Sequence, residues 1–169
     1  IIIIILLFLL LGVSLGLASP SGLSEVKVKL VRGGCPPFWF SFKGRCYKYV
    51  SSHLTWADAE LYCVSERANL VSIHSLEEHN FVKSLIQNFD HRQGLTWIGL
   101  SDTQKEGWMW SDGSPVDFSQ WNTGEPNNVG GNEDCALVNF GSELKWNDGT
   151  CSDRRPSVCV LLIHMCPMN

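Results

Sequence analysis

The arrangement of cysteines constrains this chain more than any other feature of its sequence. The 169 residues contain seven cysteines, at positions 35, 46, 63, 135, 151, 159 and 166. An apolar segment precedes them all, and cysteine-rich chains behind such a segment are typical of secreted domains that disulfides hold together. The sequence therefore predicts a disulfide framework of six cysteines, with one further thiol, although six cysteines can pair in many ways.

Spacing along the chain favours one set of pairs. Local closures would join Cys35 to Cys46 and Cys135 to Cys151, which leaves Cys63 and Cys159 to tie the two ends of the domain together. Closing a loop of that length contributes about 4–5 kcal/mol in the chain-entropy model. Cys166 then has no partner inside the domain, so it is either a tail thiol without a role or a link between two chains in a homodimer.

The N-terminal segment predicts secretion. Residues 1–18 are almost wholly apolar and end in Gly16-Leu17-Ala18, whose small residues suit signal-peptidase cleavage before Ser19. No Met or basic stretch precedes Ile1, so we expect either a signal peptide with an incomplete start or a retained membrane anchor. The first of these predicts an extracellular protein.

Composition and charge narrow the range of partners. The net charge is −4 and charged residues make up 18% of the chain, with Lys and Arg scattered, so no nucleic-acid footprint is expected. We expect one globular domain at residues 35–160. A short spacer at 19–34, which carries Pro20, Gly22, Gly33 and Gly34, precedes it, and a tail at 161–169 follows it.

The first half of the domain predicts two strands and two helices. Residues 38–50 alternate around the turn Lys43-Gly44, and Thr55 can cap a helix with Trp56, Ala59 and Cys63 on one stripe. Ser75 and Glu78 form a capping box before a second stripe, which comprises Phe81, Val82, Leu85, Ile86 and Phe89.

The second half predicts short strands separated by long loops. Apolar runs at 95–100 and 136–138 lie among Gly, Asn, Asp and Pro residues. The region offers many oxygen donors and no Cys–His ligand spacing, which indicates calcium as the metal that could order such loops. The donors are Asp102, Glu106, Glu125, Asn127, Asn128, Glu133, Asp134, Asn147 and Asp148.

Three short motifs and the cysteine framework resemble the C-type lectin family. The motifs are Trp97-Ile98-Gly99-Leu100, Glu125-Pro126-Asn127 and Trp146-Asn147-Asp148, in that order, with Glu133-Asp134-Cys135 between the last two. The resemblance spans residues 35–160 and is nearest to soluble fish lectins with a single domain. It implies an α+β fold with two helices, small antiparallel sheets and a long calcium-binding loop region, stapled by disulfides.

The resemblance also implies which residues hold calcium and sugar. The five positions that ligate the sugar-binding calcium in that family are occupied here by Glu125, Asn127, Glu133, Asn147 and Asp148. A sugar with two neighbouring hydroxyls can place both oxygens on the ion, while a carboxylate accepts and an amide donates a hydrogen bond at each hydroxyl. Acid before amide at 125 and 127 goes, in that family, with equatorial 3- and 4-hydroxyls, as in mannose, N-acetylglucosamine or fucose.

Two finer expectations accompany this assignment. A cis bond before Pro126 would aim Glu125 and Asn127 at one ion, and such bonds are accessible at X-Pro. A second calcium is expected at Asp102, Glu106, Asn128, Glu133 and Asp134, where Asn128 stands in place of the family's usual Asp and removes one negative charge.

The predicted function is therefore calcium-dependent binding of glycans on microbial or host surfaces, in innate immune recognition, and not catalysis. No nucleophile elbow accompanies the Ser, His and Asp residues. Three alternatives stay open: a type II antifreeze protein on the same scaffold, a type II membrane lectin receptor and, more distantly, a calcium-dependent hydrolase.

Overall fold

The computed structural model describes residues 28–104 and 107–162. The predicted signal peptide at 1–18, the candidate ligand Glu106 and the extra cysteine Cys166 lie outside these ranges. Within them, no helix is long and apolar enough to cross a membrane.

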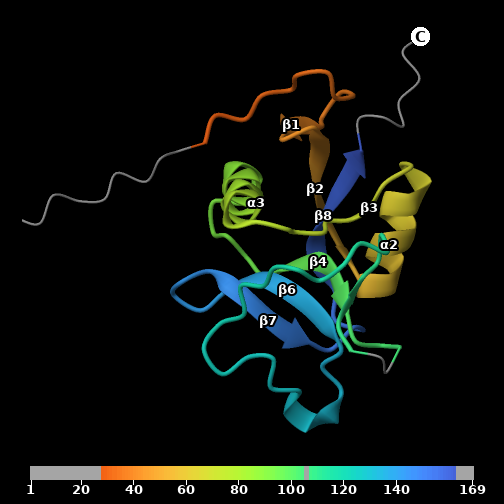
Figure 1. The fold of residues 1–169 in the computed structure, drawn as a ribbon, viewed down its shortest axis with the longest axis vertical. Helices are drawn as coiled ribbons and strands as arrows, with labels where there is room; N and C mark the ends of the chain where they lie inside the picture. The colour runs from red at the N-terminus through yellow and green to blue at the C-terminus, as the bar shows by residue number, and fades with distance from the viewer. Residues whose placement is uncertain (1–27, 105–106, 163–169) are drawn as a thin grey trace, which may run out of the picture.

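One mixed sheet forms the centre of the molecule (Figure 1). Its strands are β1 (Phe40–Phe42), β2 (Arg45–Leu54), β3 (Asn69–Leu70), β4 (Thr96–Ser101), β5 (Met109–Trp110), β6 (Cys135–Phe140), β7 (Lys145–Gly149) and β8 (Arg155–Leu162). The main path runs β1-β2-β8-β4-β6-β7, with β3 paired to β8 and β5 paired to β4. The strand β8, which ends the described chain, therefore lies between strands from the two halves of the sequence.

Two helices flank the sheet, as the sequence predicted. Helix α2 (Trp56–Ser65) begins after Thr55, whose hydroxyl accepts the N–H of Asp58. Helix α3 (Leu76–Phe89) begins after Ser75, whose hydroxyl accepts the N–H of Glu78. These side chains satisfy backbone donors that the first helical turn leaves without partners.

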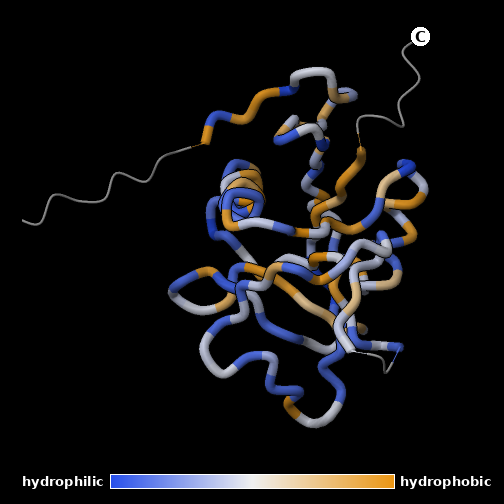
Figure 2. The backbone as a smooth tube through the Cα atoms, in the orientation of Figure 1, coloured by the Kyte–Doolittle hydropathy of each residue, from blue (hydrophilic) through white to orange (hydrophobic). Residues whose placement is uncertain are grey.

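The core lies where these helices meet the sheet. The α3 side chains of Phe81, Val82, Leu85 and Ile86 are buried, and hydrophobic stretches follow the central strands in Figure 2. Phe89 was predicted to continue this stripe but is 51% exposed, because it lies at the helix end, where it stacks on Tyr49 at the surface.

Three disulfides join the pairs that spacing favoured: Cys35–Cys46, Cys63–Cys159 and Cys135–Cys151. The second connects α2 to β8 and so ties the two ends of the described domain together. The third connects β6 to the residues that follow β7.

The sheet departs from the expected small antiparallel sheets in one respect. Strand β4 pairs with β8 in parallel, through Trp97 and Ser157, and this contact joins all eight strands into one sheet. The long loops predicted after residue 100 are present between β5 and β6, and they form the lower edge of the molecule in Figure 1.

Candidate metal and sugar site

The segment before the Glu125-Pro126-Asn127 motif is held against β7 by backbone hydrogen bonds. The N–H of Asn122 donates to Trp146 O at 2.8 Å, and the N–H of Trp146 donates to Gln120 O at 2.8 Å. Trp121 and Trp146 thereby form a parallel bridge. This pairing brings the chain around Glu125 beside the strand that carries Asn147 and Asp148.

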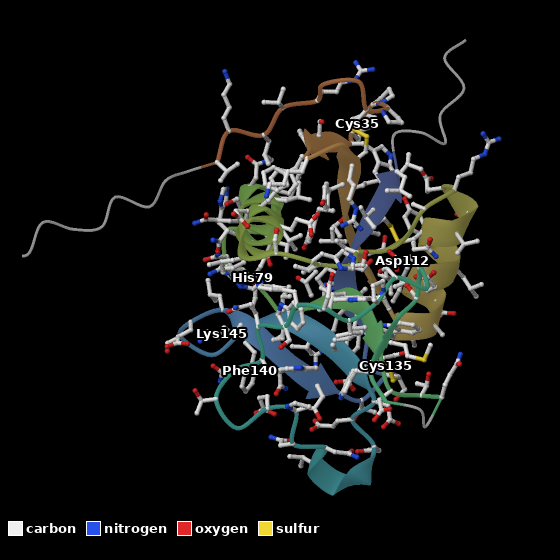
Figure 3. The ribbon with its side chains drawn as sticks, viewed as in Figure 1. Cys35, His79, Asp112, Cys135, Phe140 and Lys145 are labelled. Carbon is white, nitrogen blue, oxygen red and sulfur yellow. A yellow bond between two sulfur atoms is a disulfide. The ribbon has the colours of Figure 1, made fainter. Side chains whose placement is uncertain are left out.

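Trp146 anchors this strand in the core. Its fully buried ring packs edge-on against Trp110, Phe118 and Trp121. Its Nε1–H donates to Nδ1 of His79 at 3.1 Å, and Figure 3 shows His79 between α3 and the strands below it. Burial lowers the pKa of His79 to about 4, so this imidazole is neutral and can accept the bond.

Alternation along β7 sets the directions of the two ligand candidates. Trp146 and Asp148 are buried, and Asn147 between them is partly exposed, as expected when successive side chains of a strand point to opposite faces. Asp148 lies opposite Ala136 on β6, and Glu133 precedes β6 by two residues. Both motif regions and Glu133 therefore converge on the end of the β6–β7 pair.

Asp148 organises the loop around it. Its Oδ1 accepts the N–H of Asn127 at 3.2 Å, and its Oδ2 accepts the N–H of Asn128 at 2.7 Å. A fully buried carboxylate needs such donors, because an unpaired charge away from water is costly. This side chain therefore fixes the loop backbone directly after Pro126, whose bond to Glu125 is cis.

The remaining ligand candidates contact each other or the loop backbone. Nδ2 of Asn127 donates to Oε1 of Glu125 at 3.0 Å. The N–H of Val129 lies 3.1 Å from Oδ1 of Asn127 and 2.9 Å from Oε2 of Glu133. The structure thus gathers the three loop candidates, Glu125, Asn127 and Glu133, into one network with Asp148, next to Asn147 on β7.

Two oxygen atoms of this network are buried without a hydrogen-bond partner among the described residues. They are Oε2 of Glu125 and Oδ1 of Asn147. The pKa of Glu125 is raised by burial first, and then by the nearby negative charges of Asp148 and Glu133. Unpaired oxygens among crowded negative charges are what a cation would satisfy.

The donor set therefore fits calcium, which prefers carboxylate and amide oxygens in loosely constrained geometry. No three His, Cys, Asp or Glu side chains in residues 28–104 and 107–162 lie close enough together to form a ready metal centre. Two of the five sugar-site donors are asparagines, and Asp148 binds backbone N–H groups here. Calcium binding would require these donors to converge further.

The residues predicted for a second calcium are only partly brought together. The N–H of Asp102 donates to Asp134 O at 2.8 Å, which places the two residues side by side. Oδ1 of Asn128 accepts the N–H of Glu133 at 3.0 Å. Glu106 lies outside the described residues.

The sequence did not predict a polar cluster between the start of the β5–β6 connection and the residues just before α3. Nε2 of His74 lies 3.2 Å from Oγ of Ser114, and its Nδ1 lies 2.9 Å from Oδ1 of Asp117. Ser114 also donates to Asp112, which accepts from Ser72 as well. These contacts tie residues 112–117 to the start of α3, and the chain spacing of 40 residues between His74 and Ser114 gave no signal for them.

The chain is a member of the C-type lectin family. Residues 52–161 match the family model described as the lectin C-type domain. The motifs, the disulfide framework and the two-helix fold described above agree with this match.

Two fish lectins illustrate the likeness in sequence. The lactose-binding lectin l-2 of Anguilla japonica is 46% identical over 137 residues, which cover 78% of this chain and 81% of that protein. The galactose-specific lectin nattectin of Thalassophryne nattereri is 35% identical over 148 residues, which cover 87% of this chain and 92% of that protein.

Solved structures extend the likeness to the fold. Herring type II antifreeze protein is 38% identical with a TM-score of 0.71, covering 76% of this chain and 99% of that one. The C-type lectin CEL-I from Cucumaria echinata is 32% identical with a TM-score of 0.71, covering 75% of this chain and 96% of that one.

Proposed function

We propose that this protein is a calcium-dependent lectin for sugars with neighbouring equatorial hydroxyls, such as mannose, N-acetylglucosamine or fucose. The observation that carries the proposal is the pair of buried, unpartnered oxygens on Glu125 and Asn147, beside the charges of Asp148 and Glu133. Bound calcium would supply a cation that two neighbouring sugar hydroxyls can share.

The side chains of the site have different roles in binding the sugar. Glu125 and Glu133 accept hydrogen bonds from the sugar hydroxyls, and Asn127 and Asn147 donate to them. Asp148, which is fully buried, mainly orders the loop and contributes negative charge. Three carboxylates against a divalent cation leave the site near one net negative charge, which does not repel a neutral sugar.

Binding of galactose-type sugars is the main alternative to mannose-type specificity, because two of the relatives are named for lactose and galactose. For this chain we retain the mannose type, since the acid stands at 125 and the amide at 127. Specificity for galactose would contradict that part of the proposal and leave calcium-dependent sugar binding intact.

A column experiment tests the proposal. The protein should be retained on mannose-agarose in calcium and released by a chelator, because the ion links the sugar to the protein. The variant Asp148→Asn removes one of the three carboxylates while nearly preserving side-chain shape, and it should elute early. Retention of the wild type in the presence of chelator would contradict calcium dependence.

Ice binding is the second candidate, and the likeness to solved antifreeze proteins favours it. A structure described as a Ca2+-dependent type II antifreeze protein is 38% identical, with a TM-score of 0.70. Thermal hysteresis without retention on mannose-agarose would support this function. Retention without thermal hysteresis would support the lectin.

The wider setting follows from the same proposal. We propose a secreted protein, with residues 1–18 as signal peptide and 35–160 as the lectin domain. A second calcium would be held by Asp102, Glu106, Asn128, Glu133 and Asp134. A single shallow sugar site binds weakly, so useful avidity on a glycan-dense microbial surface requires several linked domains. Cys166 would provide such a link in a homodimer, and a dimer band on non-reducing electrophoresis that reducing agent removes would support it.

A further inference from the structure

A pocket lies away from the candidate calcium site, between the end of α3 and the start of β8. Its volume is about 440 Å³, and small-molecule sites occupy about 300–1,000 Å³. Its lining residues come from β2, from the last residue of α3 and the connection that follows it, and from residues 154–156. None belongs to the 121–134 loop or to β7.

One wall of this pocket is aromatic. Tyr49 and Phe89 both line it and stack with ring centroids 5.8 Å apart and an interplanar angle of 11°. A flat ring surface of this kind suits the apolar C–H face of a pyranose, because it buries apolar area without requiring hydrogen bonds. Burial raises the pKa of Tyr49, so its hydroxyl stays protonated and can donate.

Two arginines, Arg154 and Arg155, also line the pocket. Arg155 lies over the Trp97 ring at 5.6 Å, and its Nη2 donates to Asp153 at 2.7 Å. Its buried Nε–H has no partner among the described residues. Arg154 beside it is exposed, and we find no salt bridge from it within the described part of the chain. The pocket therefore offers guanidinium donors that Asp153 does not fully occupy.

The carboxylate of Asp90, which also lines the pocket, accepts hydrogen bonds from the backbone of the residues that follow it. Oδ1 of Asp90 accepts the N–H of Arg92 at 3.0 Å, and Oδ2 accepts the N–H of Gly94 at 2.9 Å. These bonds place both carboxylate oxygens in the turn after α3 and partly offset its charge. Asp90 thus shapes the wall while the arginines remain the charged groups that face a ligand.

We propose that this pocket is a second, calcium-independent site for an acidic saccharide that carries a carboxylate or a sulfate on a pyranose ring. The Tyr49–Phe89 wall takes the face of the ring, and Arg154 and Arg155 bind the anionic group. The site goes beyond the proposed lectin function, since it uses none of the calcium ligands. A glycan with neutral and acidic residues would engage both sites.

Amide chemical shifts of the full chain in a chelator test this site. The probes are methyl β-D-glucuronide for the carboxylate and N-acetylglucosamine 6-sulfate for the sulfate, with methyl β-D-glucoside and N-acetylglucosamine as the neutral controls. We expect either acidic probe to shift the amides of Tyr49, Ser51 and Gly94, and the neutral controls to bind at least about tenfold more weakly, since each factor of ten is about 1.4 kcal/mol.

Variants locate the binding. Arg154→Gln should weaken binding of the acidic probe about tenfold, as the loss of one charged contact predicts. Phe89→Ala should also weaken it, while Arg92→Gln, on the neighbouring turn outside the pocket lining, should leave the affinity within about twofold. An unchanged spectrum elsewhere shows that each variant is folded.

The outcomes separate cleanly. A response to only one acidic probe supports the site and identifies its anion. Absence of shifts at these amides with both probes, equal binding of the neutral controls, or equal affinity of Arg154→Gln and Arg92→Gln would each overturn the proposal. Because the titrations contain chelator, a failure of mannose binding has no bearing on them.

Discussion

His79 is the residue through which the core supports the site. Its buried imidazole accepts a hydrogen bond from Trp146, which directly precedes Asn147 and Asp148. Charges on Lys83 and Lys145 add to the effect of burial in lowering its pKa to about 4. A neutral ring at this position is therefore part of the folded state near neutral pH.

The neutral form of buried His79 makes the free energy of unfolding depend on pH. The folded pKa of His79 lies below the usual value of 6.5, so the unfolded chain binds the proton more readily. The contribution of neutral His79 to the free energy of unfolding is fully present above about pH 6.5. It is lost as the pH falls toward 4, which lowers the free energy of unfolding by up to about 3 kcal/mol. His79→Gln keeps an acceptor for Trp146 but cannot be protonated, and should show a shallower decline.

Urea unfolding between pH 7 and 4.5, in a chelator, checks this prediction. His53→Gln is the control, because His53 is exposed on β2, and it should follow the wild-type profile. Equal pH dependence of the wild type and His79→Gln would contradict a neutral, buried role for this histidine.

At the scale of elements, the Trp97-Ile98-Gly99-Leu100 motif packs β4 tightly against its neighbours. A Cβ on Gly99 would lie 2.6 Å from the carbonyl oxygen of Leu70 and 2.9 Å from Oγ of Ser111. Such distances require backbone to move, so Gly99→Ala should destabilise the fold by about 2 kcal/mol or more.

The matched control for this change is Gly34→Ala. A Cβ there meets nothing within 4 Å, and a surface substitution of this kind alters stability by less than about 0.5 kcal/mol. Thermal unfolding of both variants measures the difference. Similar melting temperatures for the two would show that β4 can shift to admit a methyl group.

The elements also show how far local sequence signals reach. The caps Thr55 and Ser75, the Lys43-Gly44 turn and the buried stripe of α3 as far as Ile86 were predicted correctly, because each depends on residues a few positions apart. The parallel pairing of β4 with β8 was not predicted, because it joins residues 60 positions apart, Trp97 and Ser157, without a local pattern.

The candidate site divides in the same way. Its ligand types and order came from motif resemblance, and the structure places the loop candidates in one network around Asp148. The core contacts that hold these ligand candidates in place could not be predicted from local sequence. The His79–Trp146 bond spans 67 residues, and the aromatic cluster around Trp146 assembles from separate loops.

For the whole molecule, the disulfides differ in what they hold. Cys63–Cys159 closes 96 residues, whereas Cys35–Cys46 closes 11. Chain entropy then assigns about 4.7 kcal/mol to the long closure and about 2.8 kcal/mol to the short one. Replacing both cysteines of the long closure with alanine should lower stability by more than the same change at the short one.

Denaturant unfolding of the two double variants measures this ranking. Both changes remove buried sulfur atoms, so the difference reflects mainly the length of chain that each bond restrains. A greater loss of stability at Cys35–Cys46 would show that local packing outweighs loop length in this fold.

The central claim is that an acid at 125 and an amide at 127, with calcium, select equatorial hydroxyls. The most direct test is inhibition of binding to mannose-agarose by free mannose and free galactose, for the wild type and for Glu125→Gln combined with Asn127→Asp. The account predicts that mannose is the better inhibitor of the wild type, and that the exchanged pair shifts preference toward galactose. Unchanged inhibition by the two sugars after the exchange would contradict it.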